Sequence, residues 1–341
     1  MGDDASPLLT DLSKLCQRHK FFVCFVTSFH HYLNNFIFIN LIMGDSEGVY
    51  TYWQLEDIAD FLKQRSNNIF PKVAIICGSG LSSIANVVEN PTEINYDEIP
   101  YFPKSTVEGQ IGSLVFGTIL EVPVIVLKGR FHFYEGYSLS KVSMPSRIFK
   151  LLGCSFLIIT NAAGGVNKKY RIGDIMMIKD HINFLGFSGN NPLRGPNEDR
   201  FGDRFPPMNK CYDKDLRKQA VRIAKKLGLL RKLHQGVYVH VAGPNYQTVA
   251  ETKMLAICGI DAVGMSTIAE VIAARHSGLI IFGFSLICEE GILDYSSNKK
   301  EPDHYDVLEA VKAMEQPLQE FVKLMVKYIG TKTPCTCGSA H

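Results

Sequence analysis

The sequence predicts a mixed α/β fold, with a single domain whose central β-sheet is flanked by helices. The run from Gly278 to Cys288 is almost wholly apolar and does not alternate, which is typical of a strand buried on both faces of a sheet. Other apolar runs of strand length alternate with segments of helical periodicity, an order typical of α/β proteins. Neither an internal repeat nor an interdomain linker interrupts this order, so we expect one domain over residues 45–330.

The first half of this domain contains most of the predicted strands. A helix over Trp53–Gln64 opens it, since Leu55, Ile58 and Leu62 recur at helical spacing. Short apolar runs then predict strands, with another helix before the last of them. The strands are Val73–Cys77, Leu114–Ile119, Val122–Lys128 and Phe156–Thr160, and the helix is Leu139–Leu152.

Periodicity disappears between Phe184 and Lys210, where Gly, Pro and Asn are frequent. A loop of this length inside a compact domain is usually functional, and we expect this one to be so. A helix with Leu216, Ala220 and Ile223 on one face follows the loop. A strand over Val237–Val241 comes next.

Two later segments, Thr248-Val-Ala-Glu251 and Thr267-Ile-Ala-Glu270, share the T-x-x-E pattern of a capping box. Each predicts a helix N-terminus directly after a strand end. The last predicted helix runs from about Tyr305 to Tyr328. It contains Pro317, which should kink it because proline has no N–H to donate.

Composition excludes several classes of partner. The 36 Lys and Arg and the 34 Asp and Glu are mixed along the chain, and no basic run could neutralise a row of phosphates, so no nucleic-acid partner is expected. Most of the nine cysteines lie in apolar stretches, which is typical of buried thiols in a reducing cytosol. We therefore expect a cytoplasmic protein. Four such cysteines are Cys77, Cys154, Cys258 and Cys288.

The two ends of the chain fall outside the domain pattern. Residues Phe21–Met43 are rich in aromatic and aliphatic side chains, but His30 and Asn34 lie in their middle and no cleavage site follows. We expect residues 1–42 to be a disordered extension rather than a membrane anchor. The tail over residues 331–341 should be flexible, and because its C-x-C lacks a second ligand pair, no metal site is expected.

Three places at predicted strand ends are suited to an anion. Gly78-Ser79-Gly80 follows a strand and precedes a helix, so it offers backbone N–H groups and a hydroxyl. Arg130 and His132 alternate after another strand, so both side chains should leave an extended segment on one face. Ser266 precedes a capped helix. Because ligands bind beyond the carboxyl ends of strands in such sheets, these places predict one bound phosphate.

Seven motifs in this chain resemble, in content and order, the trimeric class of purine nucleoside phosphorylases. The similarity extends from about Tyr50 to Tyr328. It implies reversible phosphorolysis of purine ribonucleosides or deoxyribonucleosides, as in purine salvage, by a homotrimer. Inorganic phosphate would be the co-substrate, with no cofactor and no metal. The motifs are Gly78-Ser79-Gly80, GRFHFYEGY, Thr160-Asn-Ala-Ala-Gly-Gly165, FSGNNPLRGPN, RFGDRFP, Val241-Ala-Gly-Pro244 and Ala262-Val-Gly-Met-Ser-Thr267.

The resemblance also implies a role for individual residues. Phe205, in the long loop, would reach into the neighbouring subunit's site. The ribose would lie over Tyr134 and Met265, with His304 near its 5′-hydroxyl. The phosphate site would be Ser79, Gln110, Arg130, His132, Ala162 and Ser266. The base would be held by Tyr246, Gln247 and Glu289, and the residues implied in catalysis are His132, Gln247, Glu289 and His304.

Four of these positions depart from the family pattern. Gln110 stands where the phosphate loop usually has His, which replaces a possible cation by a neutral amide. Tyr246 replaces a Phe of the base pocket and adds a hydroxyl that needs a partner. The Glu that accepts hydrogen bonds from 6-oxopurines is here Gln247, and the Asn that donates toward N7 and the 6-oxygen is here Glu289.

The last two substitutions predict a shifted base preference. An ionised Glu289 only accepts hydrogen bonds, so it would oppose the 6-oxo group of inosine or guanosine unless the carboxyl is protonated. Adenine offers a 6-amino donor to Glu289 and the N1 acceptor to Gln247, and cytosine offers the same pair at its 4-amino group and N3. We therefore expect a preference for adenosine, or for cytidine binding. Glu290 is interpreted as an ordinary loop charge.

Three alternatives compete with this interpretation. Methylthioadenosine phosphorylase, a relative, also takes a 6-amino base, but GRFHFYEGY and RFGDRFP favour the nucleoside enzyme. A nucleoside-binding protein without turnover would follow if the substitutions at 110, 247 and 289 had weakened catalysis. A dinucleotide oxidoreductase is suggested only by GSGLSS, in which Ser83 stands in place of the third glycine.

Overall fold

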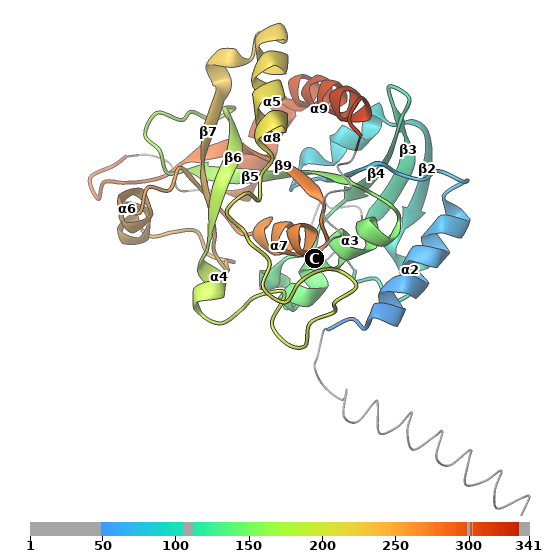
Figure 1. The fold of residues 1–341 in the computed structure, drawn as a ribbon. Helices are drawn as coiled ribbons and strands as arrows, with labels where there is room; N and C mark the ends of the chain where they lie inside the picture. The colour runs from blue at the N-terminus through green and yellow to red at the C-terminus, as the bar shows by residue number, and fades with distance from the viewer. Residues whose placement is uncertain (1–48, 105–111, 299–300, 302, 334–341) are drawn as a thin grey trace, which may run out of the picture. The chain divides into compact units, whose positions relative to one another are not determined.

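The central sheet is mixed, which confirms the predicted fold class. In this computed structural model the described residues are 49–104, 112–298, 301 and 303–333, and those from Tyr50 onward group into one compact unit (Figure 1). Their strands follow the order β2-β3-β4-β1-β5-β8-β7-β6-β9. The strands are β1 Val73–Ile76, β2 Glu89–Asn95, β3 Ser113–Ile119, β4 Val122–Lys128, β5 Phe156–Gly165, β6 Ile175–Asn183, β7 Leu233–His240, β8 Ala262–Gly264 and β9 Ile280–Glu290.

One half of the sheet closes on itself. Strand β5 pairs in parallel with β9 along its whole length, and it also pairs with β8 at its carboxyl end. Since β8, β7, β6 and β9 are paired in turn, these five strands form a ring. The carboxyl ends of β5 and β9 are thereby brought together beside the short antiparallel strand β8.

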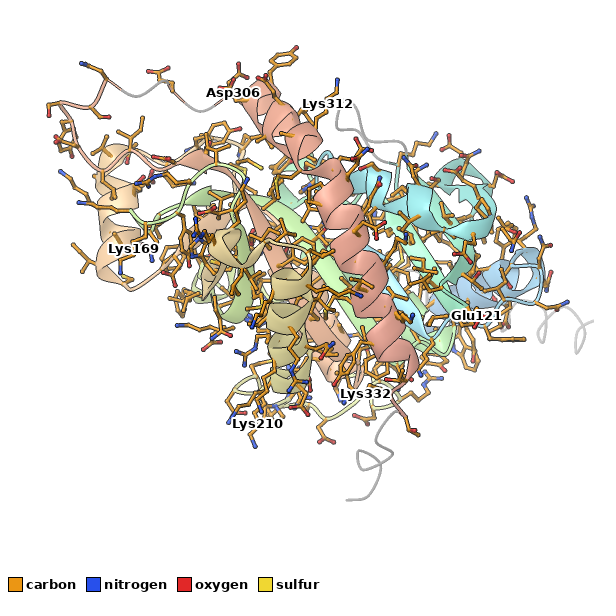
Figure 2. The ribbon with its side chains drawn as sticks, turned by 90° about the horizontal axis from the view of Figure 1, so that it is seen from above. Glu121, Lys169, Lys210, Asp306, Lys312 and Lys332 are labelled. Atoms are coloured by element: carbon orange, nitrogen blue, oxygen red, sulfur yellow. The ribbon has the colours of Figure 1, made fainter. Side chains whose placement is uncertain are left out.

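Helices cover both faces of the sheet, as alternation along β1 shows. Ala74 and Ile76 pack in the core with α2, α3 and α7, whereas Val73 and Ile75 pack in a second core with α5, α8 and α9. Figure 2 looks onto α8 and α9, which run between the labelled Asp306 and Lys332. The helices are α2 Tyr52–Arg65, α3 Leu139–Leu151, α4 Phe184–Phe187, α5 Lys214–Lys226, α6 Val249–Ile257, α7 Ile268–His276, α8 His304–Ala313 and α9 Glu315–Gly330, with a short 3-10 helix, η1, over Leu81–Val87.

Strand β9 is the buried strand expected from its composition. Its eight residues from Ile281 to Cys288 are all buried, and only its two ends are partly exposed. Glu289 and Glu290 are its last two residues, so the two carboxylates stand at the edge where β5 also ends and the antiparallel strand β8 begins. Alternation along the strand sends these two side chains to opposite faces.

The end of the chain differs from the sequence prediction. The single kinked helix is instead two helices, α8 and α9, which meet at Met314. Pro317 lies in the first turn of α9, where a missing N–H costs little because those N–H groups have no partner within the helix. The expected extension over residues 1–42, and the tail beyond residue 333, lie outside the described residues.

Two strands were missed from sequence, and one cysteine was misplaced. Strand β2 is mostly exposed at the sheet edge, and Pro91 lies within it, so it has no apolar pattern. Strand β6 is apolar only in its first four residues. Cys258 was expected to be buried, but it is exposed at the end of α6. Among the described residues no helix is both long and apolar enough to cross a membrane.

Candidate functional site

A cavity of about 310 Å³ lies at the carboxyl ends of β5 and β9, beside the short strand β8. Segments that follow β1, β4 and β7 complete its wall, as the rule for ligands at strand carboxyl ends predicts. The wall therefore collects residues spread from position 79 to position 307. The lining residues are Ser79, His132, Tyr134, Asn161, Ala162, Ala163, Gly164, Pro244, Tyr246, Gln247, Val263, Gly264, Met265, Ser266, Glu289 and Val307.

Gly78 lets the Ser79 loop approach the sheet closely. A Cβ at Gly78 would lie 2.6 Å from the Cα of Asn161, and the Gly78 N–H donates to Thr160 Oγ1 at 3.0 Å. Gly80 has a φ of 76°, a left-handed conformation in which glycine is not strained. The helix that follows, η1, is a short 3-10 helix rather than an α-helix. Ser79 lies just before it and lines the cavity.

Arg130 lies behind the cavity wall and not in it. Only 1% of the residue is exposed, and its Nη1 donates to Ser266 Oγ at 2.7 Å and to Thr267 Oγ1 at 3.1 Å. Its Nε is 3.3 Å from Glu270 Oε1, in an ion pair that is also 1% exposed. Of the two residues expected on one face of this segment, His132 lines the cavity and Arg130 reaches it through Ser266.

His132 is held by two neighbours. Its Nδ1 is 2.8 Å from Glu135 Oε1, which leaves Nε2 as the ring nitrogen for the cavity. Its ring stacks on Tyr134 at 4.6 Å between centroids with an interplanar angle of 15°. Burial, and then the charge of Glu135, raise the pKa of Tyr134 to about 12, so its hydroxyl stays protonated.

The segment before α7 corrects the second capping-box prediction. The helix does begin after Thr267, but the Thr267 side chain makes no capping hydrogen bond. Its hydroxyl instead receives Arg130 Nη1 and Asn161 Nδ2, the latter at 2.9 Å, and the carboxylate of Glu270 faces Arg130. The first box, at Thr248, is formed as expected.

Tyr134 and Met265 approach one another through a glycine. A Cβ at Gly243 would lie 2.5 Å from Met265 Sδ and 3.2 Å from Tyr134 Cδ1. Gly243 has a φ of 71°, which a side chain would disfavour for a second reason. The two residues expected under a ribose thus form one part of the cavity wall.

Glu289 reaches the cavity as a carboxyl without a partner. Its Oε2 is buried and has no hydrogen-bond partner among the described residues. Burial raises its pKa to about 7, because the charged form is poorly solvated. Gly164 makes room for this side chain, since a Cβ there would lie 2.5 Å from Glu289 Oε1. Burial, and then the charge of Glu289, also raise the pKa of Tyr246.

Glu290, which is partly exposed like Glu289, differs from its neighbour in what it faces. It does not line the cavity, it is partly exposed, and its Oε1 is 3.9 Å from Arg171 Nε. Only one of the two adjacent carboxylates therefore belongs to the site.

Two expected site residues cannot be placed and one lies elsewhere. Gln110 lies outside the described residues, and of His304 only the backbone is described, at the start of α8 and one turn before Val307 of the cavity wall. Phe205 is 85% exposed and lines a separate hollow of about 730 Å³. Asn161, Val263 and Val307 were missed from sequence, although the TNAAGG motif contains the first of them.

The site residues have no grouping suited to a metal. Across the described residues, no three His, Cys, Asp or Glu side chains gather closely enough to hold a metal ion. The charged groups of the cavity region are instead Arg130, Glu270, Glu135 and Glu289. Their arrangement is suited to binding an anion at one end and hydrogen-bonding a polar ring at the other.

Comparison with known proteins identifies the family to which this fold and cavity belong. A family model described as the phosphorylase superfamily matches residues 72–327. The purine nucleoside phosphorylase of Rattus norvegicus is 50% identical over 283 residues, which are 83% of this chain and 97% of that protein. The class defined by fold and site is therefore that of the phosphorylases. Within it, the chain belongs to the purine nucleoside phosphorylases, which are pentosyltransferases of nucleoside metabolism.

Solved structures of similar proteins agree with this placement. The Schistosoma mansoni purine nucleoside phosphorylase in complex with adenosine is 42% identical, with a TM-score of 0.78, and the match covers 82% of this chain and 98% of that one. Isoform 2 of the Schistosoma mansoni enzyme, in complex with cytosine and ribose-1-phosphate, is 41% identical, with a TM-score of 0.78, covering 82% and 97%. These comparisons do not favour the nucleoside-binding, methylthioadenosine or oxidoreductase alternatives.

Proposed function

We propose that this chain catalyses reversible phosphorolysis of nucleosides with a base preference shifted from 6-oxopurines toward bases that carry a 6-amino or 4-amino group. A phosphate oxygen attacks C1′ while the glycosidic bond breaks, and the electron pair of the glycosidic bond leaves with the base. The products are the free base, which takes up a proton, and ribose or deoxyribose 1-phosphate. The chain's contribution is to hold the anion beside the developing positive charge of the sugar, with no cofactor or metal.

The phosphate would occupy the end of the cavity that Ser79, His132, Ala162 and Ser266 line. Arg130 supports this assignment from behind, since it bonds Ser266 and carries a positive charge in a buried position. Gln110 belongs to the same proposed site by family resemblance. Tyr134 and Met265 would lie along the ribose, and His304 at the start of α8 near its 5′-hydroxyl.

The single observation that carries the base preference is the buried, unpartnered Oε2 of Glu289. An ionised carboxylate accepts hydrogen bonds and cannot donate them, so a 6-amino or 4-amino group satisfies it and a 6-oxo group does not. Leaving such a charged acceptor unsatisfied costs more than the roughly 1–3 kcal/mol of a neutral group. Gln247, in the same wall, supplies an amide that can donate to N1 of adenine or N3 of cytosine.

The test is phosphate-dependent base release from inosine, guanosine, adenosine and cytidine, compared by kcat/KM for the wild type and Glu289→Asn. We expect the wild type to prefer adenosine over inosine, and the variant to regain inosine. Glu290→Asn is the matched control, because Glu290 is the next residue and does not line the cavity. If inosine and guanosine are the best wild-type substrates across the neutral pH range, the proposed preference is wrong.

A homotrimer would explain two exposed aromatic side chains. Phe187 and Phe205 are 81% and 85% exposed, and both line the hollow of about 730 Å³ together with Leu193 and Met208. Exposed apolar surface of this kind marks an interaction site. We assign it to contact between copies of this chain, in the cytoplasm, with Phe205 completing the neighbouring site.

This assignment predicts different effects for the two aromatic residues. Phe205→Ala should raise the KM for nucleoside by about tenfold while the protein still sediments as a trimer. Phe187→Ala, at the matched exposed position, should leave that KM within about threefold. A monomer in sedimentation that retains full activity would contradict the shared site.

A further inference from the structure

Four side chains at the proposed phosphate end of the cavity form a hydrogen-bond network. Arg130 Nη1 donates to Ser266 Oγ at 2.7 Å and to Thr267 Oγ1 at 3.1 Å. Asn161 Nδ2 donates to Thr267 Oγ1 at 2.9 Å, and the two hydroxyl oxygens are 3.2 Å apart. All four residues are buried, with exposed fractions between 0% and 7%.

Counting donors and acceptors fixes the direction of the bond between the two hydroxyls. A hydroxyl has one hydrogen to donate and two lone pairs to accept with. Thr267 Oγ1 already accepts from Arg130 and from Asn161, so both of its lone pairs are used. It cannot accept a third bond from Ser266. Thr267 therefore donates its hydrogen to Ser266 Oγ.

The same count determines what Ser266 can do. Its Oγ accepts from Arg130 and, by the argument above, from Thr267, so its lone pairs are also used. The one unused acceptor of the network, Asn161 Oδ1, makes no hydrogen bond, so the hydrogen of Ser266 has no acceptor within it. Ser266 lines the cavity, so this hydrogen is available to an acceptor there. The network makes Ser266 a donor toward the cavity and prevents it from accepting.

Two further features hold Thr267 and Arg130 in this arrangement. Thr267 has a φ of 83° and a ψ of −48°, a strained conformation for a β-branched residue and one that is concentrated at functional sites. Glu270 Oε1 is 3.3 Å from Arg130 Nε, a different nitrogen from the Nη1 that donates to the two hydroxyls, and both side chains are 1% exposed. The pattern that would have capped α7 is used instead to fix a buried arginine.

We propose that Thr267 is a positioning residue that orients the hydroxyl of Ser266 as an obligatory donor to a phosphate oxygen. This proposal rests on the proposed function, which places phosphate at Ser266. Three of the four oxygens of phosphate dianion can only accept hydrogen bonds, so a hydroxyl committed to donation is suited to binding one of them. Thr267 does not line the cavity and acts through Ser266.

The experiment is a double-mutant cycle on Ser266→Ala and Thr267→Val, with KM for phosphate measured at saturating nucleoside. Each single variant should raise the phosphate KM by about tenfold, as expected for loss of a hydrogen bond to a charged group. In the Ser266→Ala background, Thr267→Val should add less than about twofold, because Thr267 acts only through that hydroxyl. The KM for nucleoside should stay within about threefold in Thr267→Val.

Three further variants separate positioning from folding. Thr267→Ser restores the hydroxyl and should return the phosphate KM to near the wild-type value. Thr267→Ala removes the hydroxyl and also the β-branch that is strained at this φ, so it serves if Thr267→Val does not fold. Thr252→Val is the matched control, since Thr252 is equally buried but its hydroxyl donates only to the backbone oxygen of Thr248.

The outcomes distinguish this inference from the proposed function. If Ser266→Ala leaves the phosphate KM unchanged, phosphate does not bind there and the proposed phosphate site fails. If Ser266→Ala raises it but Thr267→Val and Thr267→Ala do not, only the positioning role is wrong. Full additivity in the cycle also overturns the positioning role, because Thr267 would then act independently of Ser266.

Discussion

The two ends of the cavity are built in opposite ways. At the end proposed for phosphate, Arg130, Asn161, Ser266 and Thr267 bond one another, and the buried positive charge faces the buried negative charge of Glu270. At the end proposed for the base, Oε2 of Glu289 is buried with no partner, beside the partly exposed Tyr246 and Gln247. At the first end the side chains bond one another, although Arg130 Nη2 and Asn161 Oδ1 are left without a partner among the described residues, whereas at the second end the acceptor Glu289 Oε2 still needs a hydrogen-bond donor.

This difference indicates where substitution is tolerated. A network in which each group fixes the next cannot lose one member without stranding the others, so the phosphate end constrains its residues strongly. An unpartnered side chain such as Glu289 can change without stranding protein groups, and the change is felt by the ligand. Three of the four departures from the family pattern, Tyr246, Gln247 and Glu289, lie in the cavity wall at the base end.

The largest effect should follow from removing Arg130. Arg130→Met leaves Glu270 as an uncompensated buried charge, which should lower the free energy of unfolding by about 3–5 kcal/mol. Base release should fall by more than about a thousandfold, measured at a temperature where the variant is folded. Urea titration gives the stability. In the double variant Arg130→Met with Glu270→Met, stability should recover while activity does not.

The double variant separates the role of Arg130 in stability from its role in the reaction. Recovery of stability alone would show that the pair is costly to break but is present for function. If activity also returned, Arg130 would have no role in the reaction, and the contrast between the two ends of the cavity would be lost.

Glu289→Asn should have a smaller effect and no comparable cost in stability. Its kcat/KM for inosine should rise by about 10–100-fold, because the amide can donate to the 6-oxygen, and that for adenosine should fall. Its urea midpoint should equal or exceed that of the wild type, since a partly buried, unpaired carboxyl is removed. A loss of stability as large as that of Arg130→Met would mean that both ends are equally constrained.

The pH dependence of base choice should be moderate. Burial raises the pKa of Glu289 to about 7, so the carboxyl is protonated and can donate below that pH, and is ionised and accepts above it. The ratio of kcat/KM for inosine to that for adenosine should fall by about tenfold between pH 6 and 8. The protonation state of phosphate also changes over this pH range, but it affects both nucleoside substrates equally and therefore does not change the ratio. In Glu289→Gln the ratio should be flat.

The raised pKa of Glu289 also determines how its contribution to the free energy of unfolding changes with pH. Because the folded-state pKa lies above the unfolded value, ionisation costs more in the folded chain. Any stabilisation relative to Glu289→Gln is present at low pH and is lost as pH rises from about 4.5 through about 7. A difference between the two proteins that grows in the opposite direction would place the ionised carboxylate beside a cation.

The smallest effect should come from Tyr246→Phe. The ring of Tyr246 lines the cavity but is only partly buried, so water can replace a partner of its hydroxyl. We expect kcat/KM for adenosine within about threefold of the wild type. A fall of tenfold or more, measured beside an unchanged urea midpoint, would show that the hydroxyl contacts the base.

Local patterns accounted for much of the fold but not for its edges. Apolar runs located β1, β3, β4 and β9 because burial on both faces leaves a continuous signal. The edge strand β2 has no such signal, since most of its residues face water. The capping-box pattern at Thr248 was formed and the one at Thr267 was not, although the two are alike in sequence. What distinguishes them is Arg130, which lies more than a hundred residues before Thr267 in the chain. Arg130 donates a hydrogen bond to the Thr267 hydroxyl and faces the carboxylate of Glu270.

The sequence by itself determined the fold class, most of the element positions, and the motifs that resemble a nucleoside phosphorylase, because each of these is written in consecutive residues. Only the tertiary structure decided that Arg130 lies behind the cavity wall, that Asn161 belongs to the site, and that Glu289 Oε2 is buried without a partner. Those facts depend on which strand ends meet and on how far each side chain is exposed to solvent. The closed ring that joins β5, β8 and β9 sets both, through contacts between segments far apart in the chain.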